Sequence, residues 1–191
     1  MRNRALVITC MAAVLSAPGA VRSQQRGPSF YYYTFTLSSP AFPDGGEVPP
    51  RHSGAVANPV SPKLEWKDAP AGTVSFVLMM RDTDVAIDKT HDDIAHYIII
   101  NIPGSSRSLA EGLPVTPQLP DGTIQLKNFA GRPGYLGPGA PASDPHHHYA
   151  WELYALDIKL DLGPDASRVD VLKAINGHCL GKAVLVGRFH R

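Results

Sequence analysis

Apolar and aromatic residues recur in six short runs, each bounded by glycine, proline or aspartate. Such runs, rich in β-branched and aromatic residues between turn formers, are typical of β-strands. The predicted strands cover residues 30–37, 63–70, 73–82, 95–103, 149–157 and 182–189. The runs SFVLMM and YIIINI are apolar at consecutive positions, which indicates central strands covered on both faces. Six strands with little helix between them predict a mainly β protein, built as a β-sandwich.

One helix is predicted before the last strand. Its signals follow one another along the chain: Asp165 as N-cap, Val169, Leu172 and Ile175 at helical spacing, and Gly177 as the stop. Residues 104–145, by contrast, carry many glycines and prolines and no long apolar run. A loop region of about 40 residues is unusual in a compact domain, and such loops often carry function.

The 191 residues suit a single domain, and the formal net charge is only +1. Because this balance leaves no basic footprint, we expect no nucleic-acid partner and no general attraction to anionic membranes. Any electrostatic specificity must therefore be local.

Residues 1–23 have the order of a secretory signal peptide: Arg2 and Arg4, an apolar stretch, then small residues near Ala20 and Ser23. An uncleaved membrane anchor is the alternative, since the apolar stretch is borderline in length. We therefore expect a periplasmic or secreted protein with one domain over residues 30–191. After cleavage Cys179 would be the only thiol, which excludes an internal disulfide.

A run of three histidines stands at the entrance of the strand predicted near residue 149. Because side chains alternate along a strand, His147 shares a face with Tyr149 and Trp151, whereas His146 and His148 face the other way. We interpret His146 and His148 as solvated residues. An imidazole beside buried aromatic side chains needs a polar partner, so His147 is the candidate functional residue.

Two other strand ends offer such partners. One predicted strand ends at Asp82, with Asp84 close behind, and His96 stands near the start of the next. If these strands are neighbours, one end of the sheet collects carboxylates and imidazoles above an apolar floor. Ordinary turn chemistry is the alternative for the two aspartates, because Asp is common at strand ends.

Five separated stretches carry a family resemblance: NPVSPKLEWKDAP, MMRDTDVA with AHYIIINIPG, LKNFAGRPGYLGPGAP, HHYAWELYALD and GHCLGKAVLVGRF. In order and spacing they resemble the phosphatidylethanolamine-binding protein family, and most closely its bacterial branch of Raf-kinase-inhibitor-like proteins. The resemblance covers about residues 30–189. It implies a large antiparallel sheet packed on a smaller one, with one or two short helices and an anion-binding pocket near one end. It also allows a homodimer.

Matched position by position, the resemblance assigns ligand-binding roles to eight residues: Asp82, Asp84, His96, Gly137, Gly139, Pro141, His147 and Tyr149. The family's Asp-Pro-Asp-Ala-Pro motif keeps both acids here and lacks both prolines, which predicts a less rigid loop after Asp84. His148 replaces the arginine of the family's His-Arg-Tyr motif.

These residue types suit a small anion. Two imidazoles, a phenol and glycine N–H groups can all donate hydrogen bonds, and glycine lets the main chain approach closely. Asp82 can fix the orientation of one imidazole and raise its pKa, which predicts pH-dependent binding.

The sequence therefore predicts an exported protein that binds a small anionic or phosphate-bearing ligand, such as phosphate or a phospholipid head group, without a cofactor or metal and without catalysis. The first alternative is an inhibitor or regulator of a partner enzyme. A hydrolase or metalloenzyme ranks third, because two histidines and an aspartate can hold zinc or iron. The sequence has neither His-Glu-x-x-His nor Gly-x-Ser-x-Gly.

Overall fold

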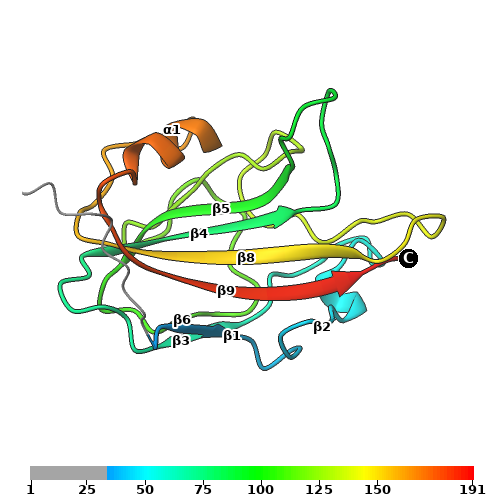
Figure 1. Cartoon of the computed structure of the whole chain (residues 1–191), viewed down its shortest axis with the longest axis horizontal. Helices are drawn as coiled ribbons and strands as arrows, with labels where there is room; N and C mark the ends of the chain where they lie inside the picture. Colours follow the sequence, from blue (N-terminus) through cyan, green and yellow to red (C-terminus); the bar gives the residue numbers. More distant parts are fainter. Residues whose placement is uncertain (1–33) are drawn as a thin grey trace, which may run out of the picture. The chain divides into compact units, whose positions relative to one another are not determined.

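Two β-sheets pack face to face in the computed structural model, which describes residues 34–191. The smaller sheet contains β1 (Thr36–Ser38), β3 (Leu64–Lys67) and β6 (Ser108–Leu109). The larger sheet contains, in spatial order, β2 (Gly46–Glu47), β9 (Cys179–Phe189), β8 (His147–Leu156), β4 (Ser75–Asp82), β5 (Ile94–Pro103) and β7 (Ile124–Gln125). Helix α1 (Arg168–Ala174) lies on the opposite side of the large sheet from the small one (Figure 1). The two-sheet prediction is confirmed.

Each predicted strand run overlaps a strand of the structure. The first run begins outside the described residues, and β1 starts only at Thr36. The short strands β2, β6 and β7 were not predicted, because two residues are too few to show a period. All strand pairs are antiparallel except β2 with β9, which is parallel.

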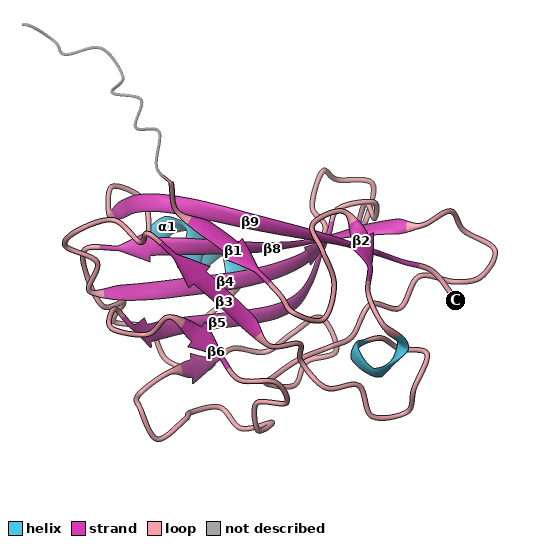
Figure 2. Ribbon diagram, turned by 90° about the horizontal axis from the view of Figure 1, so that it is seen from below, coloured by secondary structure: helices cyan, strands magenta, loops and turns pink. Residues whose placement is uncertain are grey.

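The apolar residues of β4 serve two cores. Phe76, Leu78 and Met80 pack toward the small sheet, which lies in front of the large sheet in Figure 2. Val77 and Met79 point to the other face and pack in the cluster that includes α1. Because successive side chains alternate between faces, a strand covered on both sides is apolar at every position. This explains the unbroken run SFVLMM.

The N-cap of α1 is Ser167, so the predicted cap at Asp165 is wrong. The Ser167 side chain accepts a hydrogen bond from the Asp170 N–H at 3.2 Å, and the Asp170 carboxylate accepts from the Ser167 N–H at 2.9 Å. This reciprocal pair is a capping box. Asp165 instead forms an ion pair with Lys127 at 2.7 Å.

The apolar side of α1 also differs from the predicted spacing. Val171 and Ile175 are the residues buried against the sheet, while Val169 and Leu172 are 56% and 40% exposed. These two residues are four positions apart and therefore lie on the same side of the helix. Gly177, with φ +86°, lies in the turn that follows. The second short helix is a 3₁₀ turn, Pro50–His52.

The sheet places the candidate residues at one end. Asp82, the last residue of β4, pairs with Ile94 at the start of β5 and with Tyr149 near the start of β8. The predicted proximity of Asp82 to His96 therefore follows from β4 and β5 being antiparallel neighbours.

The predicted signal peptide, residues 1–23, lies outside the described residues. Within residues 34–191 no helix has the length and apolar character required to cross a membrane.

Candidate functional site

A cavity of about 170 Å³ lies where β4 ends and β5 and β8 begin. We call it the histidine cavity. Its lining contains six of the eight predicted residues: Asp82, His96, Gly139, Pro141, His147 and Tyr149. Five further residues complete it: Val85, Ile94, Phe129, Leu136 and Ala140. Asp84 and Gly137 do not line it.

His147 and Asp82 form the central contact of the cavity. Nδ1 of His147 lies 2.8 Å from Oδ2 of Asp82, and both residues are buried. The carboxylate can only accept here, so Nδ1 carries the hydrogen and Nε2 is the second ring nitrogen. The other oxygen of Asp82 accepts the N–H of Asp84 at 3.1 Å. The imidazole is thus held in one orientation, as the sequence predicted.

His96 is held by the main chain of the long loop. Its Nδ1 lies 3.0 Å from the carbonyl oxygen of Leu136 and therefore donates to it. Its ring packs edge-on against Tyr149, with centroids 5.2 Å apart. Burial lowers the pKa of His96, and this outweighs the raising effects of the Leu136 carbonyl and the Asp82 carboxylate. The carboxylate therefore raises the pKa of His96 as expected, but desolvation has the larger effect and the net shift is downward.

The Tyr149 hydroxyl holds the loop rather than standing free. It accepts hydrogen bonds from the N–H groups of Gly139 at 3.1 Å and Ala140 at 3.2 Å. Burial, together with the Asp82 carboxylate, raises the pKa of Tyr149, so the phenol stays neutral. The Gly139 N–H, expected to serve as an anion donor, is already engaged within the protein.

Asp84 holds the start of β8 from outside the cavity. Its carboxylate accepts the backbone N–H of His148 at 2.6 Å and lies 3.1 Å from His148 Nδ1. Burial alone would raise the pKa of Asp84, but these hydrogen bonds lower it overall. His148 is exposed, as the alternation predicted, and His146 pairs with Glu47 at 2.7 Å.

Gly137 permits a close approach between two stretches of chain, not between chain and ligand. A Cβ atom at this position would lie 3.0 Å from the backbone carbon of Ser53 and from the Pro59 side chain. At Gly139 the nearest atom to such a Cβ is 4.0 Å away.

Phe129 and Leu136 form an apolar wall that sequence reasoning missed. The loop that carries them runs beside the start of β5, with the Phe129 N–H bonded to the Ala95 carbonyl and the Leu136 N–H to the His96 carbonyl. No periodic pattern marks them. The only signal was their place inside LKNFAGRPGYLGPGAP, one of the stretches that carry the resemblance.

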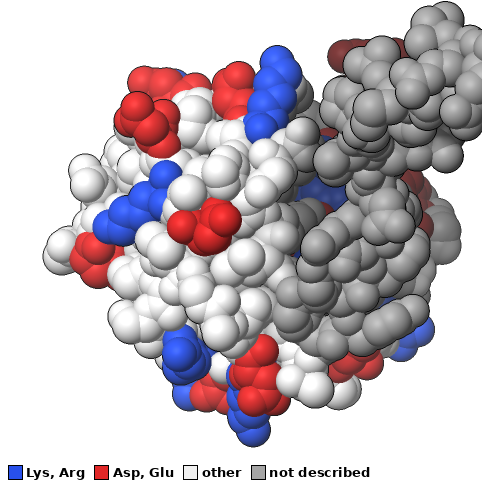
Figure 3. All heavy atoms as spheres, turned by 60° about the vertical axis from the view of Figure 1, so that its left-hand side comes forward, with Lys and Arg blue, Asp and Glu red and all other residues white. Residues whose placement is uncertain are grey.

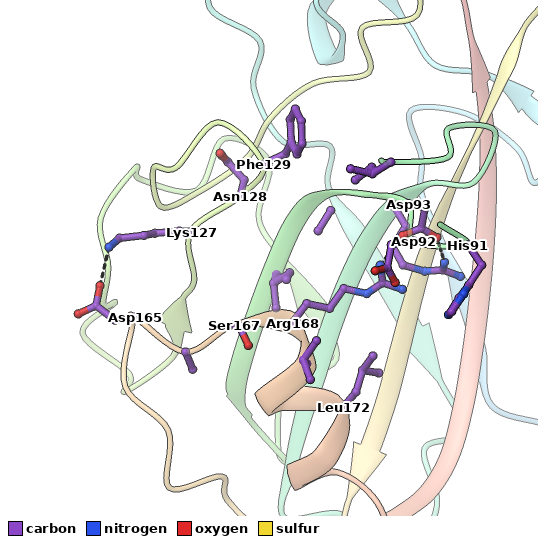
Figure 4. Close-up of a pocket in the computed structure, with 16 residues that line it drawn as sticks. His91, Asp92, Asp93, Lys127, Asn128, Phe129, Asp165, Ser167, Arg168 and Leu172 are labelled. Carbon is purple, nitrogen blue, oxygen red and sulfur yellow. Dashed lines mark hydrogen bonds and ion pairs between the residues drawn. The ribbon is translucent and has the colours of Figure 1, made fainter. Parts of the chain in front are cut away.

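A larger cavity of about 760 Å³, the helix cavity, lies beside α1. Figure 4 shows its charged side chains directed toward one another: Lys127 toward Asp165, and Arg168 toward the loop that carries Asp93. Its lining includes one histidine, His91. Phe129 lines both cavities. Because Lys127, Asp165, Arg168 and Asp93 are paired with one another, these charges are less available to a ligand.

A family model described as phosphatidylethanolamine-binding protein matches residues 38–190. The chain belongs to the phosphatidylethanolamine-binding protein family. This confirms the resemblance of the five sequence stretches, and the matched range includes every residue of the histidine cavity.

Curated relatives in the family match most of the chain. A UPF0098 protein of Methanothermobacter thermautotrophicus is 42% identical over 155 residues, covering 81% of this chain and 98% of the relative. UPF0098 protein YbhB of Escherichia coli is 34% identical over 152 residues, covering 76% of this chain and 94% of YbhB. LppC of Mycobacterium tuberculosis, named as a candidate lipoprotein, is 38% identical over 154 residues, covering 81% of this chain and 71% of LppC.

Solved structures of family members have the same fold. The crystal structure of CT736 from Chlamydia trachomatis matches with a TM-score of 0.73 at 30% identity, covering 84% of this chain and 99% of CT736. E. coli YbcL matches with a TM-score of 0.73 at 25% identity, covering 82% of this chain and 98% of YbcL.

Within residues 34–191, no group of three or more His, Cys, Asp or Glu side chains is arranged to hold a metal ion. On the face drawn in Figure 3, acidic and basic side chains are interspersed, and no large patch of one sign stands out among the described residues.

Proposed function

We propose that the protein binds a small anionic or phosphate-bearing ligand in the histidine cavity and does not catalyse a reaction on it. The main support is that two imidazoles, His96 and His147, line one small cavity. In each ring Nδ1 already donates a hydrogen bond to a protein oxygen. Each ring then has Nε2 left for a ligand. When protonated, two such rings donate two charge-assisted hydrogen bonds to one oxyanion.

The size of the histidine cavity limits what it can hold. At about 170 Å³ it is smaller than the roughly 300 to 1,000 Å³ of pockets that enclose whole organic ligands. It suits a phosphate or carboxylate group, with the remainder of a larger ligand outside. Val85, Ile94 and Phe129 add apolar surface beside the bound group, which lowers the local dielectric constant and strengthens its hydrogen bonds.

The cavity residues also support binding without catalysis. Its described lining contains no serine, threonine or cysteine to serve as an activated nucleophile. The Tyr149 hydroxyl oxygen accepts two hydrogen bonds from the loop, and its raised pKa disfavours a phenolate.

Calorimetric titration with inorganic phosphate near pH 6 tests this function. Replacing His147 with alanine removes a charge-assisted hydrogen bond of roughly 1.5–3 kcal/mol, so the affinity should fall about 10- to 150-fold. His148→Ala is the matched control, because the His148 side chain is exposed and turned away from the cavity. The phosphate affinity of this variant should stay within about threefold of that of the parent protein. Absence of binding to the parent protein, or equal losses in the two variants, would refute the proposal.

We also propose that the protein is exported, on the order of charged, apolar and small residues over positions 1–23. N-terminal sequencing of protein recovered from the periplasm or medium should begin near Val21 or Gln24. Recovery only from the cytoplasm with Met1 intact would contradict export.

A further inference from the structure

The histidine cavity is richer in hydrogen-bond acceptors than in donors. Both imidazoles donate their Nδ1 hydrogens to protein oxygens, one to Leu136 and one to Asp82. In a neutral ring Nε2 is then an acceptor, so each uncharged histidine presents a lone pair as its remaining polar atom. The N–H groups of Gly139 and Ala140 donate to the Tyr149 hydroxyl and are no longer free. The hydroxyl keeps its own hydrogen, which the nearby Asp82 carboxylate attracts.

The charges around the cavity also favour a ligand that donates hydrogen bonds. The lining includes the Asp82 carboxylate and, among the described residues, no lysine or arginine. A second carboxylate, Asp144, lies 3.7 Å from His147 Nε2. An anion without a hydrogen of its own would therefore face hydrogen-bond acceptors and negative charge. Its binding requires that the cavity take up a proton at the same time.

We propose that the cavity selects oxyanions that carry their own proton, and so prefers phosphate to sulfate near neutral pH. This inference rests on the proposed function. Inorganic phosphate keeps at least one P–OH at this pH, and that group can donate to an imidazole Nε2, whereas sulfate has none to offer. Sulfate can bind only after an imidazole has taken up a proton from water, which becomes rarer as the pH rises.

Several groups set how readily that proton is taken up. His96 and His147 face each other's charge, the carboxylates Asp82 and Asp144, and the neutral phenol of Tyr149. The carbonyls of Leu136 and Gly137 act on His96, and Asp84 lies within electrostatic reach of His147. Burial dominates at His96 and lowers its pKa, which favours the neutral ring.

Calorimetry with inorganic phosphate and with sulfate, at constant ionic strength, tests the inference at about pH 6 and about pH 8. The ratio of phosphate to sulfate affinity should rise by about tenfold or more at the higher pH, because one required proton changes affinity by up to tenfold per pH unit. A ratio that does not change with pH, while both ions bind, would overturn the inference and leave the proposed function standing. If neither ion binds at either pH, the proposed function itself fails.

The variant His147→Gln separates this selection from general charge attraction. A glutamine amide can place an N–H near the position of Nε2 at any pH, so the affinity ratio should vary with pH by less than about threefold. His148→Gln is the matched control and should keep the full dependence, since this side chain is exposed outside the cavity. Thermal unfolding checks that both variants fold. A folded His147→Gln protein that keeps the parental pH dependence would also overturn the inference.

Discussion

Asp82 and His147 form a buried pair that joins β4 to β8, with Oδ2 and Nδ1 2.8 Å apart. A carboxylate in this position holds a neutral imidazole by a hydrogen bond and a protonated one by charge as well. The pair therefore matters most when the ring must carry a proton while an oxyanion is bound.

We predict that Asp82→Asn weakens sulfate binding by about fivefold near neutral pH and by less in mild acid, because sulfate brings no proton and needs a protonated imidazole. The amide oxygen can still accept from Nδ1, so the variant loses only the charged part of the interaction, about 1 kcal/mol. In mild acid a proton is easier to obtain from solvent, and the charge of the carboxylate contributes less. Titration calorimetry at two pH values measures the difference.

Asp144→Asn is the control for this experiment. Its side chain is 42% exposed and lies 3.7 Å from Nε2, and exposed pairs contribute about 0–1 kcal/mol. Sulfate affinity should then change by less than in Asp82→Asn near neutral pH, and with little dependence on pH. Unchanged or tighter binding in Asp82→Asn at neutral pH would show that the carboxylate does not stabilise the proton.

The residues at the end of the sheet could be placed from the sequence because strand alternation is strict. Alternation put His147 and Tyr149 on one face and His148 on the other, and the structure agrees. Two strands that are neighbours and antiparallel bring the end of one to the start of the next, which placed Asp82 near His96. These relationships follow from backbone geometry and need no knowledge of the loops.

The loop contacts could not be predicted in the same way. The hydrogen bonds from Gly139 and Ala140 to the Tyr149 hydroxyl depend on where an irregular segment returns to the sheet, and no period encodes that. The same holds for Phe129 in the cavity wall. The cap of α1 is a different case, because the Ser-x-x-Asp pattern at Ser167 is visible in the sequence and was missed in favour of Asp165.

Gly137 and Gly139 offer a direct test of why each glycine is present. Gly137→Ala should lower the free energy of unfolding by about 1–3 kcal/mol, because its Cβ would press on the backbone of Ser53 at 3.0 Å. Gly139→Ala has no neighbour closer than 4.0 Å and should cost less than about 0.5 kcal/mol. Urea unfolding of both variants gives the comparison. Equal costs would mean that packing against Ser53 is not what requires Gly137.

Glu152 forms a separate ion-pair group on the face of the sheet away from Tyr149. Its carboxylate accepts hydrogen bonds from Arg81 at 2.8 Å and from Lys182 at 2.5 Å, and the residue is 7% exposed. Burial alone would raise the pKa of Glu152, but Arg81 and Lys182 outweigh it and lower the pKa below its ordinary 4.5. Glu152 is therefore a paired structural acid.

We predict that Glu152→Gln lowers the free energy of unfolding by roughly 1.5–3 kcal/mol at neutral pH, because Arg81 and Lys182 lose a charged partner. A carboxyl group whose pKa is lower in the folded state stabilises the protein above its unfolded pKa, and the stabilisation is lost as the pH falls through the folded pKa. The difference between parent and variant should therefore shrink once the pH falls below about 4.5. Urea unfolding over a pH series measures it. Glu65→Gln, which removes an exposed pair with Lys63, is the control and should show a much smaller difference. A Glu152→Gln difference that stays constant into acid would mean that the ionised carboxylate is not the source of the stability.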